Sequence, residues 1–156
     1  ISSYLYMSLV VSWTPSEVPY WTGKSYKPLF TSYIPRALWP EKPEERTGGE
    51  FGHRYRFLHL NDNITSLNLP WIVEMYANFG RWGVLIGMTL VGGFLAFLSG
   101  FFNRREMSAH EFVIGASIIF PLAYPESNFS LSTGSLLPLA VCLWLYFRVG
   151  LISRAS

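Results

Sequence analysis

Residues 82–102 have the sequence WGVLIGMTLVGGFLAFLSGFF, and this stretch decides the fold. It holds 21 residues without a single charged side chain. As an α-helix it would be about 31 Å long, which matches the hydrocarbon core of a bilayer, about 30 Å thick. We therefore expect residues 82–102 to form a membrane-spanning helix.

Two further apolar segments follow this stretch. Ser108 and Glu111 have the spacing of a capping box, which predicts a second helix over residues 108–124. A polar, turn-rich segment at residues 126–135 separates it from a third helix, expected over residues 136–151. The expected fold class is all-α, a polytopic membrane bundle of about three transmembrane helices with a large irregular and helical external loop.

The arginines predict how these helices are oriented. Two lie between the first and second helices and two lie near the C-terminus: Arg104, Arg105, Arg148 and Arg154. By the positive-inside rule both places are cytoplasmic, so residues 14–80 are expected on the external side. We divide the chain into an external loop region, residues 1–80, and transmembrane helices, residues 81–156. Because the chain starts at Ile1, we expect it to be the C-terminal part of a longer polytopic protein.

The composition agrees with this division. Half of the residues are hydrophobic and 14% are charged, against about 25% in ordinary soluble domains. Fifteen of the 22 charged residues lie between Glu17 and Arg81. The net charge of +2 is too small to indicate a nucleic-acid partner. The single cysteine, Cys142, can form no internal disulfide.

The external region contains a proline-rich stretch, YIPRALWPEKP at residues 33–43. Its three prolines prevent a continuous helix and stiffen the backbone. Arg36, Lys42 and Trp39 stand on this frame. Two fixed cations beside an aromatic ring suit a ligand that carries both phosphate and sugar.

A second polar constellation precedes the first span. Asn68 and Pro70 are start signals for a helix that would continue into it. Glu74, Asn78 and Arg81 are spaced i, i+4 and i+7, so they are expected on one face. The simpler interpretation is an ion pair between Glu74 and Arg81. Small residues on the opposite face would let another helix approach closely: Gly80, Gly83 and Gly87.

The remaining candidates carry weaker signals. His53 and His59 lie six residues apart without a third ligand at metal spacing, so no metal site is expected. Glu126 is interpreted either as a helix-ending acid or as a substrate contact at the external face. The sequence has no phosphate-cradling glycine loop and no nucleophile elbow, and no cofactor is expected.

Several of these stretches resemble a known family. They are residues 14–20, residues 23–26, the proline-rich stretch at 34–43, and residues 74–80 followed by Gly83. In order and spacing they are similar to bacterial O-antigen and exopolysaccharide repeat-unit polymerases of the Wzy type. The last seventy residues match that family only as hydrophobic helices.

The resemblance implies a multi-pass glycosyltransferase of the bacterial plasma membrane. Such enzymes join oligosaccharide repeat units carried on a polyprenyl diphosphate lipid at the outer face, without a metal. Membrane lipid and a chain-length regulator protein are the implied partners. External-loop arginines handle substrate in this family, which makes Arg36 the first residue to which that role is assigned. The chain lacks a clear second arginine motif of the kind that some O-antigen polymerases have.

The residues can be given roles in that chemistry. Arg36 would stabilise charge on the leaving phosphates, and Glu74 would take the proton of the acceptor hydroxyl. The other predicted substrate contacts are Lys42, Trp39, Tyr76, Asn78, Arg81 and Glu126, although Tyr76 and Asn78 do not share a helical face. Two alternatives stay open: a ligase that transfers finished glycan, and a non-catalytic transporter or flippase of lipid-linked glycan.

Overall fold

The structure is a computed structural model, and it describes residues 3–32, 34, 36–44, 46–103, 108–134 and 136–155. The described residues contain helices and no strand, so the predicted all-α class is confirmed. In chain order the elements are α1 (Ser3–Trp13), the 3₁₀ helix η1 (Lys24–Tyr26), α2 (Lys27–Ser32), α3 (Thr47–Arg54), α4 (Trp71–Phe102), α5 (Ala109–Leu122), α6 (Phe129–Gly134) and α7 (Leu136–Ala155).

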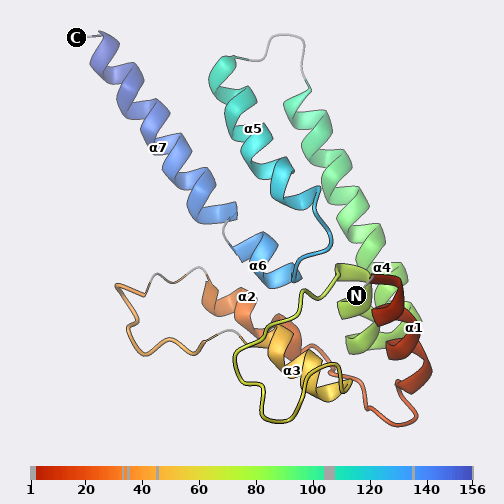
Figure 1. The fold of residues 1–156 in the computed structure, drawn as a ribbon. Helices are drawn as coiled ribbons and strands as arrows, with labels where there is room; N and C mark the ends of the chain where they lie inside the picture. Colours follow the sequence, from red (N-terminus) through yellow and green to blue (C-terminus); the bar gives the residue numbers. More distant parts are fainter. Residues whose placement is uncertain are drawn as a thin grey trace.

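The helices form two parts, as Figure 1 shows. Elements α1, η1, α2 and α3 gather with the first turns of α4 into a lower part joined by long loops. The rest of α4, α5 and α7 rise from it, and α7 ends far from the N-terminus. The short helix α6 lies between the two parts and packs against η1 and α2 below and against α5 and α7 above.

Aromatic side chains fill the core of the lower part. Phe51 on α3 is fully buried, and its ring meets Tyr6 of α1 edge-on with centroids 5.7 Å apart. The rings of Tyr55 and Phe57 lie 5.0 and 5.6 Å from Phe51. The buried hydroxyls of Tyr55 and Thr14 form a hydrogen bond of 2.7 Å. This core fixes α3, and with it the loops on either side, against α1.

Helix α4 is broken at Gly80, where φ is 64° and ψ is −153°. A residue with a side chain rarely adopts this conformation, whereas glycine has no Cβ to oppose it. The break leaves the carbonyls of Ala77 and Asn78 without their usual helical donors. The loop before η1 supplies replacements, because Trp21 N donates to Ala77 O (2.9 Å) and Thr22 N donates to Asn78 O (3.2 Å).

The break contradicts one sequence prediction and changes another. Arg81 is exposed and no longer shares a face with Glu74, because the helical register ends at Gly80. Gly83 does allow a close approach, but the neighbour is the start of α4 itself. A Cβ on Gly83 would lie 2.5 Å from the carbonyl oxygen of Met75. The short segment before the break therefore lies beside the long segment after it.

The ends of the helices differ from the sequence predictions in three places. Helix α4 begins at Trp71 with Pro70 as its N-cap, so the predicted Asn68 cap is wrong. Its first N–H donates instead to the carbonyl of Pro125, at 2.9 Å. Helix α5 ends at Leu122, two residues before the predicted end, and the segment predicted as a turn at 126–135 contains α6.

The predicted capping box of α5 is confirmed. The Ser108 hydroxyl accepts a hydrogen bond from Glu111 N (3.3 Å), and Ser108 N donates to a carboxylate oxygen of Glu111 (2.9 Å). The predicted arginine junction at residues 104–107 lies outside the described residues. The side chains of Arg148 and Arg154 are also outside them, so the predicted orientation stays a prediction.

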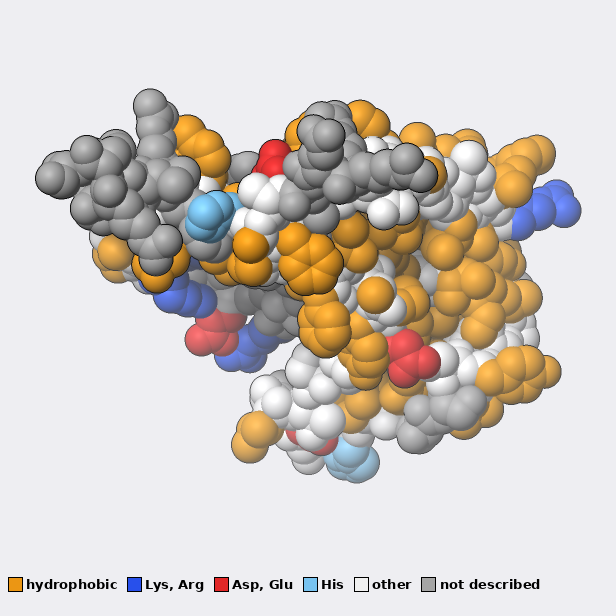
Figure 2. Space-filling model, turned by 90° about the horizontal axis from the view of Figure 1, so that it is seen from above, with side chains coloured by type: hydrophobic (Ala, Val, Ile, Leu, Met, Phe, Trp, Pro, Cys, Tyr) orange, Lys and Arg blue, Asp and Glu red, His pale blue; other side chains and the backbone are white. Residues whose placement is uncertain are grey.

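Among the described residues, α4 is the one helix long and apolar enough to cross a membrane, and it contains the span predicted at 82–102. Only 6% of its most apolar stretch is buried. Helix α5 and residues Ser132–Tyr146 are apolar but shorter. Seen from above, hydrophobic side chains cover much of the described surface, with Lys and Arg at its edges (Figure 2).

Candidate functional site

Three cations come together at a pocket of about 420 Å³ in the lower part. Lys27 comes from the first turn of α2, and Arg36 and Lys42 come from the loop after that helix. Pro28, Thr31, Pro43 and Glu44 complete the lining. We call this the basic pocket. Arg36 and Lys42, predicted from sequence to act together, do lie at one cavity.

The loop carrying these cations is tied to its own backbone. Arg36 Nη1 donates to the carbonyl of Lys42 (3.3 Å), and Lys42 Nζ donates to the carbonyl of Ile34 (3.2 Å). The backbone N–H of Lys42 donates to the carbonyl of Trp39 (3.1 Å). Ile34 and residues 36–42 are therefore linked in a closed turn that keeps Arg36 and Lys42 at the same opening. Trp39 is exposed on this turn and does not line the pocket.

Two acidic residues near the pocket, among those that the structure describes, have partners of their own. Glu44 pairs with Arg46 at 2.7 Å, and Glu50 pairs with Lys24 at 2.9 Å. The hydrogen bond and charge of Arg46, with a smaller contribution from the charge of Arg36, lower the pKa of Glu44. Among the described residues, Arg36 forms no ion pair with an acid, so its guanidinium faces a pocket whose one carboxylate is already bound to Arg46.

A buried polar network lies at the junction of the two parts of the molecule. Glu74 is 0% exposed and accepts hydrogen bonds at both carboxylate oxygens. Ser25 Oγ donates to Oε1 at 2.6 Å, and Phe129 N donates to Oε2 at 3.0 Å. Asn78 donates to Ser25 Oγ at 2.8 Å and accepts from Gly23 N at 2.8 Å. One carboxylate thus joins η1, α4 and α6.

Further contacts extend the network to α6. Ser130 Oγ donates to the carbonyl of Ser25 at 3.2 Å, and Leu69 N donates to Asn128 Oδ1 at 2.7 Å. Burial, with a smaller contribution from the negative charge of Glu74, raises the pKa of Tyr26 well above its ordinary value. The network fixes the start of α2, and hence Lys27, relative to the upper helices.

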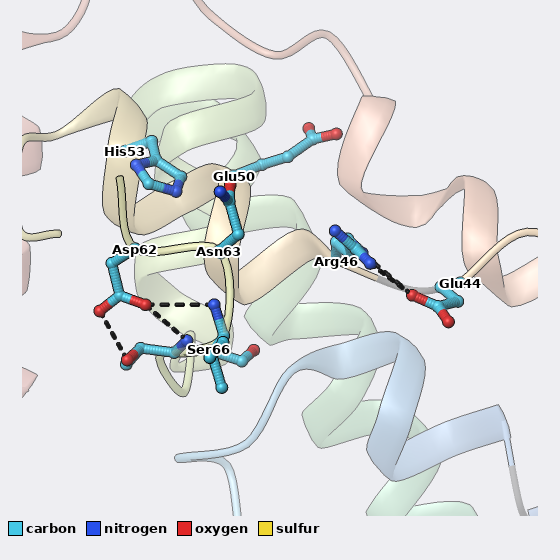
Figure 3. Close-up of a pocket in the computed structure, with 10 residues that line it drawn as sticks. Glu44, Arg46, Glu50, His53, Asp62, Asn63 and Ser66 are labelled. Carbon is cyan, nitrogen blue, oxygen red and sulfur yellow. Dashed lines mark hydrogen bonds and ion pairs between the residues drawn. The ribbon is translucent and has the colours of Figure 1, made fainter. Parts of the chain in front are cut away.

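A second pocket, of about 370 Å³, adjoins the basic pocket and shares Glu44 with it. Figure 3 shows His53 and Asp62 facing one side of it, while the Glu50 carboxylate points away toward its partner Lys24. Asp62 accepts hydrogen bonds from Ile64 N, Thr65 N and the Thr65 hydroxyl, and these bonds lower its pKa. In the described part of the chain, no three His, Cys, Asp or Glu residues gather in a way that would hold a metal ion.

The other predicted site residues lie apart from the basic pocket. Tyr76 is half-buried against the aromatic core, and Asn78 belongs to the buried network. Arg81 is exposed beyond the break in α4, and Glu126 is exposed before α6. Lys27 is a pocket residue that sequence reasoning missed. Nothing in the sequence marks it, because it lies near Arg36 only through the fold.

A family model described as a domain of unknown function, DUF8712, matches residues 3–125 of this chain. Since the match covers well over half of the chain, the protein belongs to the DUF8712 family. No curated protein and no solved structure gives a significant match. The family description assigns no activity, so the resemblance to glycan polymerases stays a prediction.

Proposed function

We propose that this member of the DUF8712 family is a membrane glycosyltransferase that polymerises oligosaccharide repeat units carried on a polyprenyl diphosphate lipid. The observation that carries the proposal is the basic pocket, where Lys27, Arg36 and Lys42 meet. Its volume of about 420 Å³ lies within the usual range for small-molecule sites, roughly 300–1,000 Å³. A diphosphate is the ligand group that three converging cations suit best.

The apolar surface of the upper helices supports a membrane location. Large aromatic side chains of α4 are exposed, among them Phe94, Phe97 and Phe101. In water such a contiguous apolar surface would be unfavourable, whereas in a bilayer it faces lipid. We place α4, α5 and α7 across the bacterial plasma membrane as a polytopic bundle, with residues 14–80 on the external side.

The chemistry assigned to the basic pocket is stabilisation of a leaving diphosphate. When the sugar leaves its carrier, negative charge grows on the phosphate oxygens, and fixed cations lower the energy of that state. Arg36 can present two parallel N–H donors, whereas Lys27 and Lys42 act as point charges. The closed turn that links Ile34 with residues 36–42 holds Arg36 in place before the ligand arrives.

The role of Glu74 in the proposal differs from the one suggested by the sequence alone. Both of its oxygens are already hydrogen-bonded, and the side chain is buried away from the basic pocket. A group that accepts the proton of a sugar hydroxyl must come within hydrogen-bond reach of that hydroxyl. We therefore assign Glu74 to positioning η1 and α6, and not to proton transfer.

The test is the length of the glycan made by cells that depend on this protein. Lys27→Ala and Arg36→Ala, at matched amounts of protein in the membrane, should leave mostly single repeat units on the carrier. Lys24→Ala is the matched control, because Lys24 pairs with exposed Glu50 and does not line the basic pocket.

Three other outcomes of this assay would argue against a polymerase. Full-length polymer from both pocket variants would contradict the proposal. Single units trapped on the cytoplasmic side would identify a flippase instead. Complete polymer that stays on its carrier would identify a ligase.

A further inference from the structure

The second pocket, of about 370 Å³, has no part in the chemistry assigned above. Most of the residues that line it are polar or charged, and Ile64 is its one large apolar side chain. His53 belongs to α3, whereas Asn63 and Ser66 belong to the loop that follows this helix (Figure 3). The pocket thus offers hydrogen-bonding groups from two separate segments to one ligand.

The charged and the uncharged groups of this pocket differ in what they bind. The Glu44 carboxylate accepts two hydrogen bonds from Arg46, at 2.7 and 3.1 Å. In the part of the chain that the structure describes, three polar side chains of the lining make no hydrogen bond: His53, Asn63 and Ser66. These three groups can therefore bond to a ligand without giving up a bond within the protein.

The loop that carries Asn63 and Ser66 is already held in shape. The Asp62 carboxylate accepts hydrogen bonds from Ile64 N (3.1 Å), Thr65 N (2.9 Å) and the Thr65 hydroxyl (2.7 Å). Because three donors meet at one carboxylate, the backbone on both sides of Asn63 is fixed. A ligand would lose little affinity in ordering this loop.

The position of the second pocket relative to the basic pocket indicates which ligand group would reach it. Glu44 lines both pockets, so they adjoin. In a lipid-linked glycan the first sugar is bonded directly to the diphosphate. If the diphosphate lies among Lys27, Arg36 and Lys42, its first sugar comes within reach of the second pocket.

We infer that the second pocket is the subsite for the sugar bonded to the diphosphate, a neutral ring whose hydroxyls hydrogen-bond to His53, Asn63 and Ser66. The inference rests on the proposed function, because that function assigns the basic pocket to the diphosphate of the same ligand. A sugar hydroxyl both donates and accepts hydrogen bonds, and so do the Asn63 amide and the Ser66 hydroxyl. These side chains would then help to select the donor glycan.

Other classes of ligand fit the second pocket less well. An anion would lie beside the carboxylates of Glu44 and Asp62, whereas the adjoining basic pocket offers three cations. A metal ion would need a group of suitable ligands, and the described residues gather no such group. An apolar group would cover polar side chains without replacing their hydrogen bonds to water. The lining thus favours a neutral sugar.

The experiment compares the carrier lipid with and without its glycan. The whole protein, purified in dodecyl maltoside, is titrated with undecaprenyl diphosphate and with the same lipid carrying one repeat unit, isolated from cells that lack the protein. Bound ligand is counted by native mass spectrometry. The wild type should bind the glycan-bearing carrier about tenfold more tightly, the effect of two or more neutral hydrogen bonds. Equal affinity for the two carriers would overturn the inference.

Two variants locate the effect. Asn63→Ala and Ser66→Ala each remove a hydrogen-bonding group from the second pocket. Each should weaken binding of the glycan-bearing carrier about fivefold and leave binding of the bare carrier unchanged. The matched control is Asn61→Ala, because Asn61 is an exposed residue of the same loop that does not line the pocket.

Two results would overturn the inference and leave the proposed function standing. In the first, Asn63→Ala and Ser66→Ala bind the glycan-bearing carrier as tightly as the wild type does. In the second, they lose affinity for the bare carrier as well, which would place a phosphate in the second pocket. If a variant does not fold, the comparison of the two carriers on the wild type still decides.

A different pair of results would end the proposed function and this inference with it. The first is a wild type that binds neither carrier. The second is an Arg36→Ala variant that binds both carriers as tightly as the wild type, because the diphosphate would then lie outside the basic pocket.

Discussion

Among the described residues, Arg36 is held by a backbone carbonyl and forms no ion pair with an acid. Its guanidinium donates to the carbonyl of Lys42, and its charge makes a small contribution to lowering the pKa of Glu44. Glu44, which lines the same pocket, is paired with Arg46. A cation held by neutral acceptors keeps its attraction for an anionic ligand, whereas a cation in an ion pair loses most of it.

Under the proposed function, this arrangement predicts how Arg36 responds to substitution. Arg36→Lys keeps the charge but loses the two-pronged donor, so transfer should slow by about 1.5–3 kcal/mol in activation free energy, roughly tenfold to a hundredfold in rate. Arg36→Ala should slow it further, and Lys42→Ala should slow it less than Arg36→Ala. The measurement is the rate of chain growth in isolated membranes. An Arg36→Lys variant with the wild-type rate would show that the geometry of the guanidinium is unimportant.

Glu74 is predicted to matter for stability. In Glu74→Gln, the new NH₂ group must face either the Ser25 hydroxyl or the Phe129 N–H, which are both donors to the carboxylate. Loss of one buried, charge-assisted hydrogen bond should cost about 1–3 kcal/mol of stability. Thermal unfolding of the protein in detergent measures this cost. The control is Glu50→Gln, because exposed ion pairs such as Lys24–Glu50 contribute only about 0–1 kcal/mol.

A different result would support a role for Glu74 in proton transfer. If Glu74→Gln kept the wild-type unfolding temperature but lost activity, the original assignment of Glu74 as proton acceptor would regain support. Equal and small effects in Glu74→Gln and Glu50→Gln would show that the buried network contributes little to stability.

At the scale of the elements, the break in α4 decides which residues meet. It turns the short segment that carries Glu74 and Asn78 back beside the long apolar segment. The backbone N–H groups of Trp21 and Thr22 in the loop then donate hydrogen bonds to the two carbonyls that the break frees. The break is thus what brings η1, and the basic pocket beyond it, close to the upper helices.

Gly80→Ala should destabilise the protein through two separate causes. The positive φ of 64° is unfavourable for alanine, and a Cβ would lie 2.7 Å from the Tyr20 hydroxyl oxygen. We expect a loss of about 1–3 kcal/mol, measured by thermal unfolding. Gly92→Ala is the control in the same helix, since no atom lies within 4 Å of its added Cβ and alanine favours helix. Equal unfolding temperatures for the two variants would mean that α4 can straighten without cost.

Local signals in the sequence predicted the long apolar helices α4, α5 and α7, but not the bounds of α2, α3 and α6, nor how the helices meet. The capping box at Ser108 and the apolar run of α4 are short-range patterns, and both correspond to the structure. The break at Gly80 was missed, because a glycine within a helical pattern does not reveal the sign of its φ. Lys27 was missed as well, since its proximity to Arg36 depends on the whole loop.

At the scale of the whole molecule, charged groups and apolar surface lie in different places. The lower part is polar, whereas the upper helices are apolar. The cations of the basic pocket lie in the lower part, whereas the exposed aromatic side chains of α4, such as Phe94 and Phe97, lie on the upper helices. Under the proposed function, the phosphates and sugars of a lipid-linked glycan bind at the lower part and its hydrocarbon tail lies along the apolar surface of the upper helices. The buried network around Glu74 connects them, so the two environments keep a fixed relative position.

Under the proposed membrane location, this division predicts which side of the membrane each part of the protein faces. In a variant whose exposed Cys142 has been replaced by Ala, a cysteine at Asn63 should react with an impermeant thiol reagent in intact cells. A cysteine at Asn103 should react only after the cells are opened. Both positions are exposed, so access through the membrane decides the difference and burial does not. Asn63 lies in the loop of the lower part, and Asn103 follows the far end of α4. Labelling at Asn103 alone in sealed cells would invert the orientation, and labelling at both would place α4 outside the membrane.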